Sequence, residues 1–285
     1  MLSRFKNKLA KLCLFFKKEA PLETTARQEL LERIDAIKDT PPSTREVAWE
    51  KYRLQLRQYL SKGDLRNFLR WDPILSSMFN NAHKNEFEYL VRDNKWLPLL
   101  EETWHGNPQK YKYYKKTSGN LVHTAYNLDQ LINKTKINLA NVQTILEFGG
   151  GYGCMANLIQ KMGFSGAYSI FDIPEFLALQ KYYLQLNGAD MQVKFFDSVD
   201  SINVVSPDIF IATWSLSEAP IELRDSLLQK IGRPHYVLIA YQQNFCGIDN
   251  VKYFGKYIES NNDYIWANSL IEHLPGNYYL IGIKK

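Results

Sequence analysis

The chain has 285 residues, of which 45% are hydrophobic, 23% charged and 14% aromatic. These values are typical of a globular protein with a sizeable core, and they exclude a disordered, collagen-like or disulfide-stapled chain. The net charge is +5, but residues 1–18 carry six cations and no acid, so the rest of the chain sums to −1. A nearly neutral body argues against a nucleic-acid-binding surface.

The cysteines are few and widely spaced. Cys13, Cys154 and Cys246 form no C-x-x-C pair, which predicts neither a disulfide framework nor a structural zinc site and indicates a reducing compartment. No apolar run approaches the roughly 20 residues that cross a bilayer. We therefore expect a cytoplasmic protein.

Residues 1–18 have the pattern of a basic amphipathic helix. Their apolar residues recur every three or four positions, with lysines between them: Leu2, Phe5, Leu9, Leu12 and Phe16. Such a helix either docks on its own domain or makes a peripheral contact with the anionic inner membrane. A cleaved signal peptide is disfavoured, because the charges are spread out and the apolar stretch 12–16 is short.

The next part of the chain is mainly helical. Residues 22–38 are polar and helix-like, and the prolines at 41–42 break the pattern. Ser43 and Glu46 then form a capping box that opens a helix to about Leu60. Helical patterns continue to about residue 136.

Residues 107–120 are predicted to form a loop, because lysines and tyrosines alternate there without a helical or strand period. Aromatic rings beside cations can hold a sugar ring or an anionic acceptor. The other interpretation is that these tyrosines only pack.

After residue 141, short apolar runs alternate with helical patterns, which predicts a parallel sheet covered on both faces. The predicted helices are residues 154–162, 174–186 and 221–231, and the predicted strands are residues 144–148, 167–171, 192–196, 208–214, 236–241, 264–268 and 278–283. Too few residues join the last two strands for a crossover helix, so these strands should pair antiparallel. We expect an α/β, Rossmann-like fold at 141–285 behind a helical region at 1–140.

A glycine-rich turn follows the first predicted strand. It begins with Glu147 and ends with Gly153, in the order Glu-Phe-Gly-Gly-Gly-Tyr-Gly. Glycines there let the backbone approach a ligand, and the N-terminus of the next helix offers free N–H groups. Asp172, nineteen residues further on, is placed to bind ribose hydroxyls. Glycine spacing alone leaves NAD and other adenosyl cofactors open.

The acid-x-Gly-x-Gly-x-Gly pattern that starts at Glu147 resembles motif I of class I S-adenosylmethionine-dependent methyltransferases. Asp197 follows the third strand, where that family places an acid near the adenine, and the closing antiparallel hairpin is typical of the family's sheet. The resemblance covers residues 141–285. The helical first half and the segment 208–218 are similar to the sugar O-methyltransferases of bacterial surface-polysaccharide loci.

The resemblance implies a cofactor site for S-adenosyl-L-methionine. It implies that Glu147 acts on the methionyl ammonium and that Asp172 takes the ribose. It places the other contacts at Gly149, Gly151, Gly153, Ile173, Asp197, Ser198 and Trp214. Each acid also has a structural interpretation: Glu147 as a helix-dipole carboxylate, Asp172 as an N-cap and Asp197 as a turn residue.

Methyl transfer to a sugar hydroxyl needs an aligned nucleophile and a base. The candidates for the base are Glu218, His273 and His123, each of which has a packing or capping role as its alternative. His235 is expected to be structural. No paired aspartates end the fourth strand, so we expect no metal.

These patterns predict an S-adenosylmethionine-dependent O-methyltransferase that acts on a carbohydrate hydroxyl in polysaccharide synthesis, with residues 1–140 covering the acceptor pocket. Two alternatives remain: an NAD-dependent oxidoreductase and a non-catalytic methyltransferase-like binding module. A nitrogen acceptor is less favoured, because no Asn-Pro-Pro-Tyr type signature follows the fourth strand.

Overall fold

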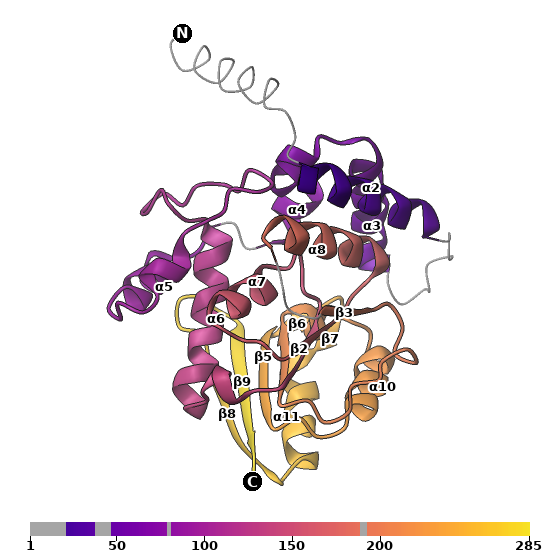
Figure 1. Cartoon of the computed structure of the whole chain (residues 1–285). Helices are drawn as coiled ribbons and strands as arrows, with labels where there is room; N and C mark the ends of the chain where they lie inside the picture. Colours follow the sequence, from indigo (N-terminus) through magenta and orange to yellow (C-terminus); the bar gives the residue numbers. More distant parts are fainter. Residues whose placement is uncertain (1–20, 38–46, 79–80, 189–192) are drawn as a thin grey trace.

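A sheet of seven strands lies at the centre of the protein (Figure 1). The computed structural model describes residues 21–37, 47–78, 81–188 and 193–285. The strand order is β3-β2-β1-β4-β5-β9-β8, in which β1 to β5 are parallel and β9 is antiparallel to both neighbours. The strands are β1 (Thr144–Phe148), β2 (Ala167–Phe171), β3 (Val193–Phe196), β4 (Ile209–Thr213), β5 (Tyr236–Gln242), β8 (Tyr264–Leu270) and β9 (Asn277–Lys284).

The central strands are continuous apolar runs because both of their faces are covered by helices. β1, β4 and β5 are buried along almost their whole length. The predicted α/β fold is therefore confirmed, including its terminal antiparallel hairpin. The strand order reverses between β1 and β4, and ligands of open α/β sheets bind at such a reversal.

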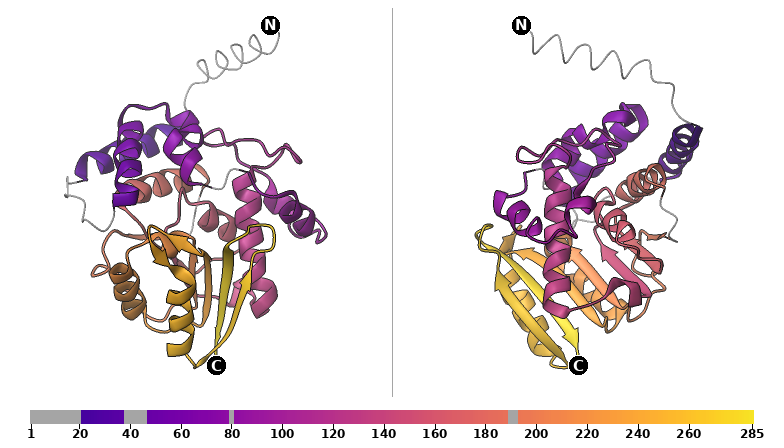
Figure 2. Two further views of the ribbon diagram at one scale, coloured as in Figure 1. Left: turned by 180° about the vertical axis from the view of Figure 1, so that it is seen from behind. Right: turned by 60° about the vertical axis from the view of Figure 1, so that its left-hand side comes forward.

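Successive residues of each strand point to opposite faces of the sheet, so alternate residues belong to two separate hydrophobic cores. Ile145 and Ile211 pack with α6 (Gly119–Thr135), α7 (Cys154–Lys161) and α8 (Pro174–Leu186). Leu146 and Phe210 point the other way, toward α10 (Ile221–Ile231) and α11 (Asn250–Ser260). Figure 2 shows the sheet between these two helical layers.

The helices before residue 140 continue the first of these cores. Leu30, Leu56 and Phe68 belong to the same buried cluster as the sheet residue Ile145, and α2 and α3 pack on α8. The predicted helical N-terminal region is thus confirmed, whereas a domain boundary at residue 140 stays a prediction. The elements are α2 (Pro21–Ala36), α3 (Val47–Lys62), η1 (Leu65–Arg70), α4 (Asp72–Ser77), α5 (Lys84–Leu90), η2 (Leu97–Leu100) and η3 (Leu139–Asn141).

The sequence patterns did not predict some of the helices and strands. These are α9 (Ser215–Glu218), the hairpin of β6 (Asn244–Phe245) and β7 (Ile248–Asp249), and α11. The predicted loop 107–120 is irregular except for an isolated bridge between Lys110 and Ser118 and the start of α6. The predicted helix at 1–18 and the capping box of Ser43 and Glu46 lie outside the described residues. Within the described ranges, no helix is long and apolar enough to cross a membrane.

A buried carboxylate fixes α3 on the first turn of α8. Glu175 is 1% exposed. Its Oε2 accepts a hydrogen bond from Arg53 Nε at 3.1 Å, and its Oε1 accepts one from Arg57 Nε at 3.2 Å. A carboxylate in the first turn is also stabilised by the helix dipole. The N-terminal region is therefore held close to Asp172, which lies three residues before Glu175.

We predict that Glu175→Ala destabilises the protein by about 3 kcal/mol, because it removes the buried carboxylate that Arg53 and Arg57 share and leaves Glu50 as the acid beside Arg53. Urea unfolding followed by circular dichroism measures this loss. Glu259→Ala, at an exposed position in α11, is the control and should change stability by less than about 0.5 kcal/mol. Equal stability of the two variants would contradict the prediction.

Candidate functional site

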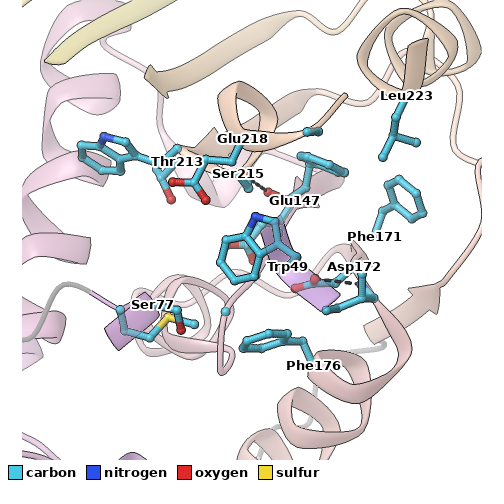
Figure 3. A pocket seen from close by; sticks show the side chains of 18 of the residues that line it. Trp49, Ser77, Glu147, Phe171, Asp172, Phe176, Thr213, Ser215, Glu218 and Leu223 are labelled. Carbon is cyan, nitrogen blue, oxygen red and sulfur yellow. Dashed lines mark hydrogen bonds between the residues drawn. The ribbon is translucent and has the colours of Figure 1, made fainter. Parts of the chain in front are cut away.

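A large cavity opens at the carboxyl ends of the parallel strands, over the exits of β1 and β4 (Figure 3). Its volume is about 1140 Å³. Sites for small molecules usually occupy about 300–1,000 Å³, so this cavity is large enough for a nucleoside-sized ligand. Its wall is built from the glycine-rich turn after β1, the segment after β4, and the helices α3, α4 and α6.

The glycine-rich turn brings the exits of β1 and β4 into contact. The Gly149 N–H donates to the Phe171 carbonyl at 2.9 Å, and the Ser215 hydroxyl donates to the Phe148 carbonyl. Gly149 has φ +74°, and a Cβ there would lie 2.2 Å from Ser215 Cβ. Only glycine fits this position. Gly151 also has a positive φ of +58°, so the backbone itself forms the cavity floor.

Two carboxyl groups lie beside this turn. Glu147 is 3% exposed and accepts a hydrogen bond from Tyr168 Oη at 2.8 Å. Burial, with a smaller contribution from the Asp172 charge, raises the pKa of Glu147 to about 7. Asp172 accepts bonds from Gln180 Nε2 at 2.7 Å and from the Ile173 N–H at 2.8 Å. Burial nevertheless raises the pKa of Asp172 to about 7. A cationic ligand would favour the ionised form of both.

An apolar slot lies beyond these acids. Phe171 and Leu223 border one side of the cavity (Figure 3), and Ile173 lines it at the start of α8. Asp197 and Ser198 are exposed lining residues that follow β3. Apolar walls with polar groups at the rim suit a flat heterocycle that has hydrogen-bonding edges.

The segment after β4 forms the opposite side of the cavity, where Thr213 and Glu218 lie (Figure 3). Trp214 has a positive φ of 64°, which is strained for a bulky residue. Its indole Nε1 donates to Asn277 Oδ1 at 2.7 Å, which fixes the ring. Burial raises the pKa of Glu218 to about 7, although Gln242 Nε2 donates to the carboxylate at 3.4 Å.

A buried carboxylate joins two of the predicted histidines. Glu86 Oε1 lies 2.8 Å from His123 Nδ1 and 2.7 Å from His273 Nε2. His123 lines the cavity, and its ring centroid is 5.0 Å from that of Trp214. Burial opposes ionisation of Glu86, but the bonds to the two imidazoles outweigh it, so the pKa of Glu86 is below its ordinary value.

Most of the predicted site residues line this one cavity: Glu147, Gly149, Gly151, Asp172, Ile173, Asp197, Ser198, Trp214, Glu218 and His123. Their individual roles stay predictions. Two expectations need correction. Gly153 caps α7 with φ +100° and lies behind the turn rather than on the cavity wall. His273 does not reach the cavity either, because Glu86 holds its ring.

Sequence reasoning missed the residues that the N-terminal helices contribute to the wall. They include Trp49, Ser77, Asn120, Thr124 and Asn127. A signal existed for three of them, since Asn120, Thr124 and Asn127 recur at helical spacing with His123. Such a polar stripe on a largely buried helix indicates a ligand-facing surface. Nothing local marked Trp49 or Glu86.

In the described part of the chain, no three histidine, cysteine, aspartate or glutamate side chains cluster so as to hold a metal ion. The expected metal independence stays a prediction, since this observation concerns side-chain clusters only.

No protein-family model matches the chain. No curated protein sequence matches it either. Among solved structures, an O-methyltransferase family protein from Burkholderia thailandensis is similar, with TM-score 0.43 and 10% identity over 57% of each chain. Magnesium protoporphyrin IX methyltransferase from Synechocystis, solved with bound SAH, has TM-score 0.42 and 13% identity over 57% of this chain and 84% of that one. An Aquifex aeolicus SAM-dependent methyltransferase has TM-score 0.41 and 14% identity over 54% and 88%.

We predict that the ligand-free protein loses stability as pH rises from about 4.5 to about 7. A folded carboxyl with a raised pKa holds its proton more tightly than the unfolded one, so the folded state binds more protons in this window and stability falls with pH. Glu147→Gln should flatten the slope of unfolding free energy by up to about 1.4 kcal/mol per pH unit.

Urea unfolding at pH 5, 6, 7 and 8 measures this slope, with Glu259→Gln at the exposed α11 position as the control. A slope that is the same in wild type, Glu147→Gln and the control would show that the Glu147 carboxyl titrates normally.

Proposed function

We propose that this protein is an S-adenosylmethionine-dependent methyltransferase. The observation that carries the proposal is the pair of carboxyl groups, the buried Glu147 and the half-buried Asp172, beside a glycine-rich turn at the β1/β4 reversal. S-adenosylmethionine carries an ammonium and a sulfonium, so an anionic site attracts it. The residues that line the cavity fit this cofactor without rearrangement of the turn.

In this proposal each part of the cavity takes one part of the cofactor. The backbone from Gly149 to Gly151 would hold the methionine end, with Glu147 near its ammonium. Asp172 would accept hydrogen bonds from both ribose hydroxyls. The slot of Phe171 and Leu223 would take the adenine. When bound, the cofactor supplies a methyl carbon on positively charged sulfur, and the C–S electron pair leaves with the sulfur as a neutral thioether.

The same features disfavour a nicotinamide dinucleotide. Its diphosphate is anionic, and a dinucleotide site offers N–H groups and few acids where the diphosphate lies. Here the buried Glu147 lies two residues before the first glycine, where its ionised carboxylate would repel the diphosphate. The antiparallel β8–β9 hairpin is also foreign to the ordinary dehydrogenase sheet.

We infer that the acceptor is a sugar hydroxyl. Beside the cofactor region the cavity is lined by hydroxyl and amide groups from the N-terminal helices, at Ser77, Asn120, Thr124 and Asn127. Asn120 Nδ2 donates to Tyr152 Oη and Asn127 Oδ1 accepts from Tyr279 Oη, so a ligand would use the other amide atom of each side chain. Trp49 packs edge-to-face on Phe176 and lies near Asp172 (Figure 3), so its indole borders the end of the cavity proposed for the cofactor. The sequence resemblance to sugar O-methyltransferases suggests a glycan of polysaccharide synthesis.

We predict that S-adenosylhomocysteine binds to the protein and that NAD does not. Asp172→Asn should weaken S-adenosylhomocysteine binding by about 10- to 100-fold, because a hydrogen bond to a charged group contributes about 1.5–3 kcal/mol. Calorimetric titration measures both. Asp200→Asn changes an exposed acid outside the cavity and is the control. Tighter binding of NAD than of S-adenosylhomocysteine would overturn the cofactor assignment.

The acceptor class is tested by incubating the full chain with S-adenosylmethionine carrying a tritiated methyl group and panels of free, nucleotide-linked, lipid-linked and polymeric sugars. We expect label in one glycan fraction, stable to mild alkali as an ether is. Transfer only to an amine or to a non-carbohydrate would exclude the sugar acceptor. Cofactor binding without any transfer would favour a binding module.

A further inference from the structure

We propose that Glu218 is the base that takes the proton of the acceptor hydroxyl, and that the buried Arg224 positions it. The proposal rests on the proposed function, because an oxygen acceptor must lose its proton when it is methylated. Glu218 ends the one-turn helix α9, and Arg224 lies at the end of the first turn of α10. Only Glu218 would touch the acceptor.

The helix α9 places Glu218 at the floor of the cavity. Ser215, which begins this helix, donates to the Phe148 carbonyl and lies against Gly149 of the glycine-rich turn. Figure 3 shows Glu218 at the same edge of the cavity as Ser215 and Thr213. The carboxylate therefore lies close to the contact between the exits of β1 and β4.

The Glu218 carboxylate is available to a ligand. Its Oε1 accepts one long hydrogen bond from Gln242 Nε2, at 3.4 Å. Its Oε2 has no hydrogen-bond partner within the described ranges and is not closed off from the cavity. The helix α10 begins after Pro220 without a side-chain cap, so Glu218 is not used to cap it. A hydroxyl group in the cavity can thus reach this carboxylate.

A half-buried carboxylate suits proton removal near neutral pH. Burial raises the pKa of Glu218 to about 7, against a smaller opposite effect of Gln242. A base is most effective when its pKa lies near the working pH. As the hydroxyl oxygen bonds to the methyl carbon, the C–S electron pair leaves with the sulfur and the hydroxyl proton passes to Glu218. A positive and a negative charge disappear together, and the proton leaves to solvent after the product departs.

Other titratable side chains of the cavity are less well placed. His123 Nε2 is buried away from solvent, and its Nδ1 is engaged by a buried carboxylate. Glu147 and Asp172 lie at the end of the cavity proposed for the cofactor. Glu222 is exposed in the first turn of α10, next to Leu223 at the proposed adenine slot.

Arg224 holds the peptide groups on both sides of Glu218. Its side chain is fully buried. Its Nε donates to the Ala219 carbonyl at 2.8 Å, and its Nη2 donates to the Ser217 carbonyl at 2.5 Å. Its Nη1 donates to Asn250 Oδ1 at 2.7 Å, and Asn250 Nδ2 donates in turn to the Ser217 carbonyl at 3.2 Å. One planar guanidinium thus fixes the two carbonyls that flank Glu218.

The burial of Arg224 is costly, which indicates a role beyond folding. In the described part of the chain it forms no salt bridge, and its charge faces carbonyl oxygens and the ring of Tyr253, whose centroid is 4.9 Å from Cζ. A buried charge without a counter-ion destabilises a protein, and the helix dipole opposes a cation in a first turn. We infer that the clamp is kept because it prevents α9 from turning the Glu218 carboxylate out of the cavity.

The first test needs no acceptor. Carbon-13 NMR of the full chain labelled at its glutamate carboxyl carbons, with the Glu218 signal assigned by its loss in Glu218→Gln, reports the ionisation of this group. We expect it to titrate near pH 7 in the ligand-free protein. Titration at the ordinary glutamate value of about 4.3 would overturn the proposal, whatever the protein methylates.

The same signal reports the distance from the reactive end of the cofactor. S-adenosylmethionine should lower the pKa of Glu218 further than S-adenosylhomocysteine does, because only the first compound carries a sulfonium charge, and a nearby cation favours the carboxylate. Equal titration with the two compounds bound would place Glu218 away from the methyl group and would overturn the proposal. Failure of both compounds to bind would instead overturn the proposed cofactor.

The second test uses the glycan that the labelled-methyl panel identifies. Glu218→Gln should lower kcat by at least about 100-fold, with S-adenosylhomocysteine affinity within about twofold of wild type. Wild-type kcat should rise with pH to a plateau, because the base must be ionised, and Glu218→Gln should lose this dependence. Glu259→Gln, at the exposed α11 position, is the matched control. An inactive Glu222→Gln beside an active Glu218→Gln would overturn the proposal.

The positioning role of Arg224 is tested with lysine, which keeps the charge but cannot bridge both carbonyls. Arg224→Lys should lower kcat by about 10- to 100-fold at nearly unchanged KM. It should also move the titration of Glu218 toward the ordinary value, because a released α9 exposes the carboxylate to water. Asn250→Ala should cause smaller changes of the same sign, and it replaces Arg224→Lys if that variant does not fold. Unchanged kcat and unchanged titration in the folded variants would exclude the clamp.

A wild-type protein that binds S-adenosylmethionine but methylates no sugar would contradict the proposed acceptor class. The comparison of the two bound compounds by NMR would still decide whether Glu218 lies beside the methyl group.

Discussion

The cavity depends on the contact between the exits of β1 and β4. Gly149 and Ser215 approach so closely that a single methyl group on Gly149 would lie 2.2 Å from Ser215 Cβ. This contact leaves backbone, rather than side chains, on the floor between the two strands. Every other wall residue is placed relative to it: Glu147 and Asp172 on one side, Trp214 and Glu218 on the other. The helices α3, α4 and α6 cover the cavity on the side opposite this contact.

Three carboxyl groups around this floor share one electrostatic property, since burial raises the pKa of Glu147, Asp172 and Glu218 to about 7. The site is thus close to the balance between neutral and anionic forms at physiological pH. Glu86 differs, because two imidazoles keep it ionised. A cationic ligand can therefore ionise the three acids that line the cavity, whereas Glu86, which does not line it, is already a fixed negative charge.

The sequence predicted the sheet well because each strand is an apolar run bounded by turns; residues 208–214, for example, contain β4 at Ile209–Thr213. The glycine-rich turn and its acids were also predictable, because Glu147 to Gly153 are consecutive in the chain and Asp172 follows the next strand. Glu86 was not, because its burial arises only when the short, polar α5 packs against α6. His273 was expected in the cavity for its place at the ligand end of the sheet. α5 and α6 intervene there and direct its ring to Glu86.

The bond between Glu86 and His273 joins residues 187 positions apart, whereas Glu86 and His123 are only 37 apart. Closing the longer loop costs more chain entropy and waits for β8 and β9 to pair. During folding, the helices α5 and α6 can bring their carboxylate and imidazole together early, while the second imidazole arrives with the last strands. A partly folded chain would then hold the contact between Glu86 and His123 without the one between Glu86 and His273, so the cluster of the three side chains would be complete only in the last step of assembly.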